Sequence, residues 1–349
     1  MPQPQLSKAA SLEQLLAAKE IVICCGSGGV GKTTVAAAAA TMASLSLGGK
    51  VLVLTVDPAR RLADAMGLEA FGNAETKVSL EPLRKLGFDP RGELWAAMLD
   101  TKQSWDELVR RHAPDRATAR RILDNPMYRN VSGKFVQSHE YIAMERLYDL
   151  HRSGKYDLIV VDTPPTRNAL DFLAAPDRMV DFFSSRLLRW LTGPARSRVL
   201  NLASRPFYHA ADRVLGSQFL EDVAEFFLNF QTMYPGFVER ARAVERLFHH
   251  RRTTFLIVTT LEAAPLHEAE YFIDAMAKRS FHLGALVLNK VLPAYLLAPD
   301  AVRVAEQIAA DAPLIAAGLS AAGAPDEVAR VLREVSQSFL NFEVVAKRE

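Results

Sequence analysis

The sequence predicts an α/β fold, a doubly wound and mostly parallel sheet with an inserted helical subdomain, on two observations. First, short apolar, β-branched runs recur along the chain with helical patterns between them, as in strands buried on both faces of a parallel sheet. Second, the composition is globular, since 49% of the 349 residues are hydrophobic and 23% are charged. That much apolar surface excludes a chain that is disordered throughout.

The predicted strands are the continuous apolar runs, at Ile21–Cys25, Val51–Val56, Leu158–Val161, Phe255–Val258 and Leu283–Leu288. An Ala-rich segment, Val35–Leu47, follows the first run and predicts a helix, because alanine has the highest helix propensity. Strands that alternate with helices are typical of a parallel sheet covered by helices on both faces.

Two long intervals, residues 101–150 and 178–248, interrupt this alternation and predict helices. The first carries many arginines, and the second is rich in Phe, Leu and Arg. Between Arg178 and Gly216 there are seven Arg against two Asp, a local charge of +5. We expect the two intervals to form a helical subdomain within a single domain that spans residues 1–349.

Charge and cysteine content narrow the class of protein. Lys and Arg number 42 and Asp and Glu 40, and a net charge of +2 argues against a dedicated nucleic-acid binder. The two cysteines, Cys24 and Cys25, are adjacent, which excludes a disulfide framework and a Cys-based zinc site in one chain. We expect buried, inert thiols, a cytoplasmic location and no membrane-spanning helix.

The strongest motif lies between the first predicted strand and the Ala-rich helix, the context that a phosphate-binding loop requires. Its glycines let successive N–H groups face phosphate oxygens, and the helix N-terminus adds partial positive charge. Lys32 is expected to reach the β- and γ-phosphates, and the Thr33 hydroxyl to ligate Mg²⁺. The predicted nucleotide-binding residues of this loop are Gly26, Ser27, Gly28, Gly29, Val30, Gly31, Lys32, Thr33 and Thr34.

Polar residues follow three of the other strands. Asp162 ends one of them, where a carboxylate supports a Mg²⁺ shell, and Pro165 belongs to the stiff loop that follows and can sense a γ-phosphate. Asp57 ends a second strand, where it can orient or deprotonate the attacking water. Asn289 ends the last, where an amide can read adenine. The alternatives are a strand-capping Asp162, an Asp57-Pro58 turn and an ordinary turn at Asn289.

Taken together, these residues resemble the ArsA-type ATPases of the deviant P-loop class, which include the arsenite-pump ATPase and the ATPase that targets tail-anchored proteins. The segment Gly26–Thr34 is similar to the family P-loop. Asp57-Pro58-Ala59, continuing to Leu62 and Asp64, is similar to its switch I. Asp162–Thr166 is similar to its switch II. The resemblance covers most of the chain.

The resemblance implies a P-loop fold and an ATP-hydrolysing dimer with two nucleotides at a face-to-face interface. Lys32, Thr33 and Asp162 would hold ATP and Mg²⁺, and Asp57 would position the water. Asn289 falls where the family contacts adenine. Opening and closing of the dimer would move the helical subdomains, as switch loops ordered by a γ-phosphate generally do.

One departure concerns the signature lysine of the family P-loop, which reaches across the dimer to the partner's phosphates. This chain has Ser27 at that position, and a hydroxyl supplies no such charge. Catalysis is then slow, or Arg60 or Arg61 compensates, or a Lys-bearing paralogue pairs with this chain in a heterodimer. Arg60 and Arg61 stand where relatives often carry His and Asn, and the alternative for both is a solvated basic turn.

Two further departures concern metals. The targeting members clamp their dimer with a C-x-x-C zinc motif, which this chain lacks, and the arsenite enzyme uses a cysteine triad. Cys24 and Cys25 lie in the strand before the P-loop and cannot substitute for that triad, so arsenite is not expected as a substrate. The interval 178–248 fits three interpretations: packed core, a groove for an apolar client helix, or contact with an anionic membrane surface.

We therefore expect a cytoplasmic Mg²⁺-dependent ATPase that couples its nucleotide state to dimer shape and to a client or a membrane partner. The alternative is a nucleotide-binding regulatory subunit with little activity of its own, which Ser27 motivates. A partitioning-type ATPase acting at a membrane or on DNA fits less well, because those relatives tend to be compact and this chain has a large predicted helical insertion.

Overall fold

The computed structural model describes residues 11–56, 61–68, 73–126, 128, 138–164, 181, 225–226, 228–229, 232–319 and 324–347. Contacts divide the chain into two compact units, one of Met1–Thr259 with His267–Val287 and the other of Thr260–Leu266 with Leu288–Glu349. Within these described ranges we find no candidate for a membrane-spanning helix.

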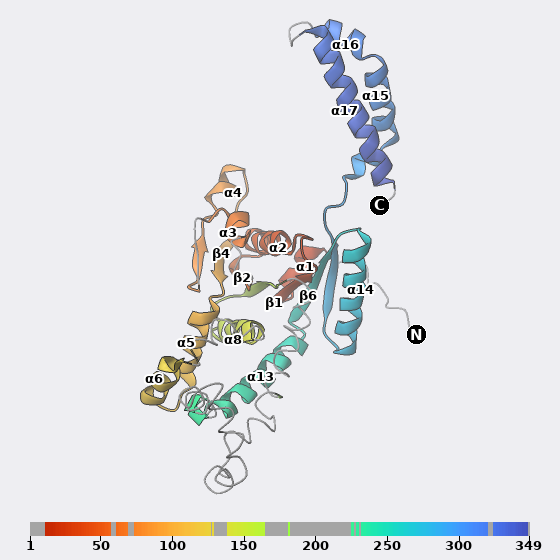
Figure 1. Cartoon of the computed structure of the whole chain (residues 1–349). Coiled ribbons are helices and arrows are strands. Elements are labelled where there is room, and N and C mark those ends of the chain that lie inside the picture. Colours follow the sequence, from red (N-terminus) through yellow and green to blue (C-terminus); the bar gives the residue numbers. More distant parts are fainter. Residues whose placement is uncertain are drawn as a thin grey trace, which may run out of the picture. The chain divides into compact units, whose positions relative to one another are not determined.

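The first unit is built on a seven-stranded sheet with the order β3-β4-β2-β5-β1-β6-β7 (Figure 1). Its strands are β1 (Ile21–Gly26), β2 (Gly49–Thr55), β3 (Thr76–Val78), β4 (Gly92–Met98), β5 (Leu158–Asp162), β6 (Thr253–Thr259) and β7 (Leu283–Leu288). The strand β1 pairs in parallel with β5 and β6, and β2 with β4 and β5, while β3 runs antiparallel to β4. The predicted α/β class with a mostly parallel sheet is confirmed.

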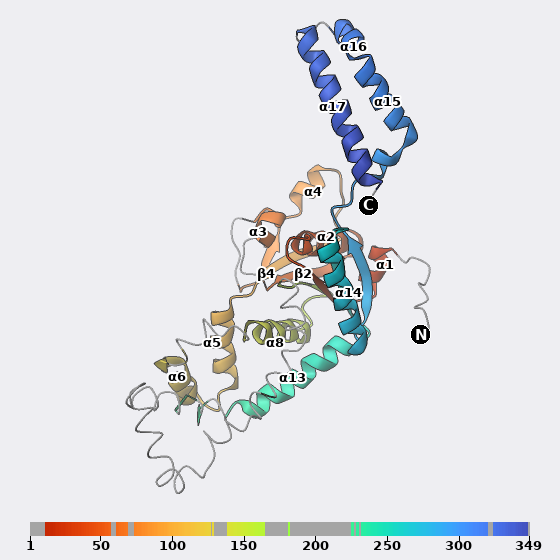
Figure 2. The same ribbon diagram turned by 45° about the vertical axis from the view of Figure 1, so that its right-hand side comes forward.

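Helices cover both faces of this sheet. Those that precede β7 are α1 (Leu12–Ala17), α2 (Lys32–Ser46), α3 (Arg61–Met66), α4 (Glu81–Lys85), α5 (Thr101–His112), α6 (Arg116–Asp124), α8 (Ser138–Arg152), α13 (Tyr234–His249) and α14 (Ala263–Lys278). Figures 1 and 2 show α2 and α8 on opposite sides of the sheet.

The core has two layers because the central strands are apolar on both faces. In β1, Ile21, Ile23 and Cys25 belong to a cluster with the buried side chains of α5, α8 and α13. Val22 and Cys24 belong to a second cluster with those of α1 and α2. The period of two along an extended strand thus sends alternate side chains into different layers.

The structure refines two of the predicted elements. The strand β7 lies at the edge of the sheet and leaves Leu283 and Leu286 more than 40% exposed, so it is not buried on both faces as the apolar run predicted. The helix predicted from Val35 begins at Lys32, because Gly31 is its N-cap at a φ of +94°, a left-handed conformation that glycine adopts at low cost.

The helical intervals are described in part. The helices α5, α6 and α8 fall largely within 101–150, and α13 lies at the end of 178–248. Most of that second interval lies outside the described residues.

The second unit is helical and contains η2 (Ala294–Leu297), α15 (Pro299–Ala310), α16 (Ala312–Gly318) and α17 (Pro325–Ala346). Its small core joins α16 to α17 through Ala312, Ala316 and Ala329, with Val328 and Leu332 against them. On α17, Val331, Val335 and Phe342 remain exposed.

Candidate active site

The loop between β1 and α2 begins at Gly26 and ends at Gly31, and the backbone at both positions requires glycine. A Cβ atom at Gly26 would lie 2.1 Å from the carbonyl oxygen of Val258 in β6, so any side chain there would collide with the sheet. At the other end, Gly31 caps α2 in the left-handed conformation. The loop therefore turns tightly from the strand into the N-terminus of a 15-residue helix, a position that favours anions.

Lys32 is the first residue of α2, and its side chain is folded over this loop. Its Nζ donates a hydrogen bond of 2.8 Å to the carbonyl oxygen of Ser27, and the residue is only 7% exposed. The Oγ of Ser27 is also buried and has no hydrogen-bond partner among the described residues. The ammonium group is thus stationed at the phosphate-binding loop.

A buried carboxylate stands at the end of the neighbouring strand. Asp162 ends β5, is 1% exposed and accepts a hydrogen bond of 3.1 Å from the Thr55 hydroxyl at the end of β2. The register explains this contact, because Asp162 is aligned with Cys24 of β1 on one side and with Thr55 on the other. Parallel pairing thereby brings three strand ends to one edge of the sheet.

Thr163 ties this edge to the strand before the loop. Both its N–H and its hydroxyl donate to the carbonyl oxygen of Cys24, at 3.3 and 2.7 Å. The residue after the buried carboxylate is therefore fixed beside the start of the phosphate-binding loop.

These elements enclose a cavity of about 380 Å³ at the mouth of the loop. It combines loop glycines, two cations, one acid and several hydroxyls. The residues that line it are Gly29, Gly31, Lys32, Thr33, Thr34, Arg61, Asp64 and Thr163. Backbone amides, hydroxyls and cations are the groups that bind a phosphate chain.

The residues present also fit a magnesium ion. The hydroxyl-bearing Thr33 lines the cavity, and Asp162 directly precedes Thr163, another lining residue. Mg²⁺ prefers oxygen ligands and is usually held by one or two protein groups together with substrate phosphates. The described residues contain no cluster of three or more His, Cys, Asp or Glu side chains that could hold a metal.

The two cysteines do not form such a site. Both are fully buried in β1, and burial raises the pKa of each thiol, to about 12 for Cys25. Thiolates, not thiols, ligate metals and metalloids. The environment of Cys24 and Cys25 therefore supports the expectation that arsenite is not bound there.

The sheet is mostly parallel and carries a glycine-rich loop at its carboxyl edge, with a lysine over that loop and a buried carboxylate at a neighbouring strand end. This combination is typical of P-loop nucleotide-hydrolysing enzymes. Residues 19–300 match the family model of the anion-transporting ATPases, ArsA_ATPase, and the chain belongs to this family. It is an ATP-binding ATPase.

The similar proteins have names of two kinds, ATPase ASNA1 homolog or GET3 and arsenical pump-driving ATPase. An ATPase ASNA1 homolog of Entamoeba dispar is 23% identical over 82% of each chain. An ATPase GET3 of Malassezia globosa is 26% identical over 81% of this chain and 76% of its own. A putative arsenical pump-driving ATPase of Chlorobaculum tepidum is 27% identical over 77% of this chain and 60% of its own.

The predicted site residues divide into three groups. Of the predicted loop residues, Gly29, Gly31, Lys32, Thr33 and Thr34 line the cavity with Arg61, whereas Gly26, Ser27, Gly28 and Val30 belong to the same loop but are not among the lining residues. Asp162 lies at the end of the adjacent strand. Asp57, Arg60 and Pro165 lie outside the described residues. Asn289 directly follows β7 and belongs to the second compact unit.

Three residues near the loop were not among the predicted site residues: Thr55, Asp64 and Thr163. Asp64 and Thr163 lie in the segments that resemble switch I and switch II, and that resemblance is the signal that could have found them. Thr55 could not have been found, because its contact with Asp162 depends on the strand order.

Proposed function

We propose that this chain hydrolyses ATP in a Mg²⁺-dependent reaction at the cavity of the β1–α2 loop, and that it works as a dimer whose shape follows the nucleotide state. The observation that carries the proposal is the meeting of Lys32, Thr33 and Thr163 in one cavity, with the buried Asp162 immediately before Thr163 in the chain.

Each residue has a separate role in this proposal. Lys32 exchanges the carbonyl of Ser27 for phosphate oxygens, and the loop amides hold the rest of the phosphate chain. The Thr33 hydroxyl and the Asp162 carboxylate hold Mg²⁺, which supplies charge neutralisation of the phosphates when it is bound. Asp57 orients the attacking water, and Asn289 contacts the adenine.

The first prediction tests Lys32. We expect Lys32→Ala to lower ATP turnover by at least about 100-fold, because the phosphates lose their nearest buried cation. Phosphate release under saturating Mg²⁺–ATP measures this loss, with Lys85→Ala on α4 as the matched control, since Lys85 is exposed and lies outside the cavity.

The proposed role of Asp57 is tested separately. Asp57→Asn should retain nucleotide binding in calorimetry and hydrolyse ATP slowly. Wild-type turnover in both site variants would contradict these roles.

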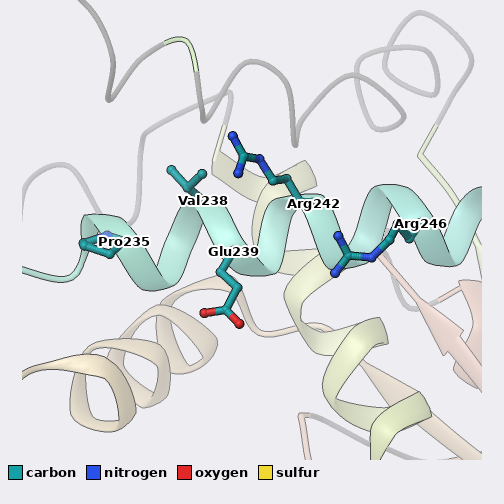
Figure 3. Close-up of a pocket in the computed structure, with 5 residues that line it drawn as sticks. All are labelled: Pro235, Val238, Glu239, Arg242 and Arg246. Atoms are coloured by element: carbon teal, nitrogen blue, oxygen red, sulfur yellow. The ribbon is translucent and has the colours of Figure 1, made fainter.

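The proposed binding partner is inferred from the family resemblance and from the positive charge of the helical intervals. We propose that residues 101–150 and 178–248 form a helical subdomain that binds an apolar client or an anionic membrane surface. On the described part, Arg242 and Arg246 of α13 line an exposed cavity of about 350 Å³ with Pro235, Val238 and Glu239 (Figure 3). Two cations against one acid among the described residues that line this cavity favour an anionic partner.

A regulatory subunit with little activity of its own, paired with a Lys-bearing paralogue, has less support, because the similar proteins are named ATPases. Turnover of the purified chain alone separates the two proposals. Steady hydrolysis without another protein contradicts the regulatory role, and hydrolysis that begins only when a paralogue is added contradicts the main proposal. We further propose a cytoplasmic location, no specific nucleic-acid partner and no arsenite substrate.

A further inference from the structure

A second cation besides Lys32 lines the cavity of the β1–α2 loop, and it comes from a different part of the sheet. Arg61 is the first residue of α3, which follows β2, and β5 lies between β2 and β1 in the sheet. Two strand spacings amount to roughly 10 Å. Arg61 therefore comes to the cavity from the element after β2, and α3 packs against α2, the helix that follows the phosphate-binding loop.

The backbone beneath Arg61 is anchored, whereas its side chain is at the surface. The next residue, Leu62, is 1% exposed and belongs to the core that α2 covers. Arg61 itself is exposed and lines the cavity together with Asp64, one turn further along α3. A fixed backbone with an exposed guanidinium suits a group that meets a ligand at the mouth of a site.

The loop position that differs from the family pattern supplies no charge. The residue there is Ser27, and it is 8% exposed, so its hydroxyl is enclosed by its own chain. Its backbone oxygen is occupied by Lys32. Apart from Lys32, Arg61 is the one cation among the described residues that line the cavity.

We propose that Arg61 binds the terminal phosphate of ATP in its own site and so replaces the cation that the loop lacks at Ser27. This inference rests on the proposed function. The loop amides and Lys32 hold the phosphates nearest to α2, which leaves the terminal phosphate for the second cation that lines the cavity. Arginine suits this contact because its planar fork binds phosphate oxygens in pairs. Arg61 thereby distinguishes ATP from ADP.

The test is nucleotide affinity, measured by calorimetry with Mg²⁺–ATPγS and Mg²⁺–ADP. We expect Arg61→Ala to weaken ATPγS binding roughly 10- to 100-fold, the value of a charge-assisted hydrogen bond, and to leave ADP binding within about twofold. Arg61→Lys should recover part of the loss. Arg116→Ala is the matched control, because Arg116 is also the exposed first residue of a helix and lies outside the cavity.

A double variant tests whether Arg61 replaces the charge that is missing at Ser27. Ser27→Lys combined with Arg61→Ala should regain the preference for ATPγS if the two positions supply the same charge. Equal weakening of ATPγS and ADP by Arg61→Ala, or no change in either, overturns the inference. If Lys32→Ala also leaves binding and turnover intact, the proposed function fails as well, so the two failures are distinguishable.

Mixing variants tests whether Arg61 acts in its own site. A mixture of Arg61→Ala and Lys32→Ala chains, assayed at Mg²⁺–ATP below saturation, should hydrolyse no more ATP than the two chains assayed separately, because each site still lacks one cation. Recovery of turnover on mixing would mean that Arg61 is supplied by a second chain, which contradicts the proposal.

Discussion

At the scale of single residues, hydrogen bonds within the chain orient the charged groups of the candidate site. The Thr55 hydroxyl holds one oxygen of the Asp162 carboxylate, and Lys32 is held at the carbonyl of Ser27. Groups that orient a metal ligand typically change metal affinity 10- to 100-fold when they are removed. Thr55 is thus a positioning residue for the proposed Mg²⁺ site, although it does not line the cavity.

We predict that Thr55→Val, which is similar in shape but lacks the hydroxyl, raises the Mg²⁺ concentration needed for half-maximal ATP hydrolysis by roughly 10-fold. Loss of the buried hydrogen bond should also destabilise the fold by about 1–2 kcal/mol. Thr55→Ser retains the hydroxyl and serves as the control. An unchanged Mg²⁺ requirement in the valine variant, together with the expected loss of stability, would show that the hydroxyl is only structural.

At the scale of elements, α8 and α13 are joined by a buried ion-pair network. Arg240 of α13 donates to Glu145 at 2.5 Å and to Asp149 at 2.6 Å, both on α8. Tyr141 donates to Glu145, and Arg111 of α5 pairs with Asp149. Because α8 leads into β5, which ends in Asp162, and α13 leads into β6, this network fixes two helices that precede strands of the site.

The network also sets protonation states. Burial raises the pKa of the Glu145 carboxyl, and the Arg240 guanidinium partly counteracts this. Burial lowers the pKa of His112, and the cations Arg240 and Arg111 lower it further. The raised pKa of Glu145 means that the fold gains stability as pH falls through that pKa. The lowered pKa of His112 means that the fold loses stability as pH falls below about 6.5.

We predict that Arg240→Met destabilises the fold by about 3–5 kcal/mol near pH 8, because a buried carboxylate loses its cation. The loss should shrink toward pH 5.5. Without Arg240, the pKa of Glu145 rises further and its proton stabilises the fold, and the penalty on protonating His112 falls. Thermal unfolding followed by circular dichroism measures both effects, with Arg242→Met on the exposed side of α13 as the control. A loss independent of pH would contradict this account of Glu145 and His112.

At the scale of the whole molecule, the chain comprises a sheet-based unit with the cavity and a helical unit, α15 to α17. The net charge of +2 gives little electrostatic self-repulsion, so association of two copies is not opposed by charge. The proposed dimer is therefore governed by the nucleotide and by surface complementarity.

We predict that Asp57→Asn, which should bind ATP and hydrolyse it slowly, doubles its mass in sedimentation when Mg²⁺–ATP is added. Nucleotide binding at a shared interface stabilises association by mass action. Lys32→Ala under the same conditions should keep its nucleotide-free mass. A single monomeric species for both variants at every nucleotide concentration would contradict the dimer.

The sequence by itself determined the class of fold, the phosphate-binding loop and the strand-end carboxylate Asp162, because these follow from local spacing and from continuous apolar runs. It missed β3 and β4, and it overestimated the burial of β7, since an apolar run does not reveal whether a strand lies at an edge. Only the tertiary structure decided that β5 separates β1 from β2. That order brings Thr55 to Asp162 across 107 residues and Arg61 to the cavity of Lys32. Strand order is set by long-range pairing and packing, which local patterns along a chain do not encode.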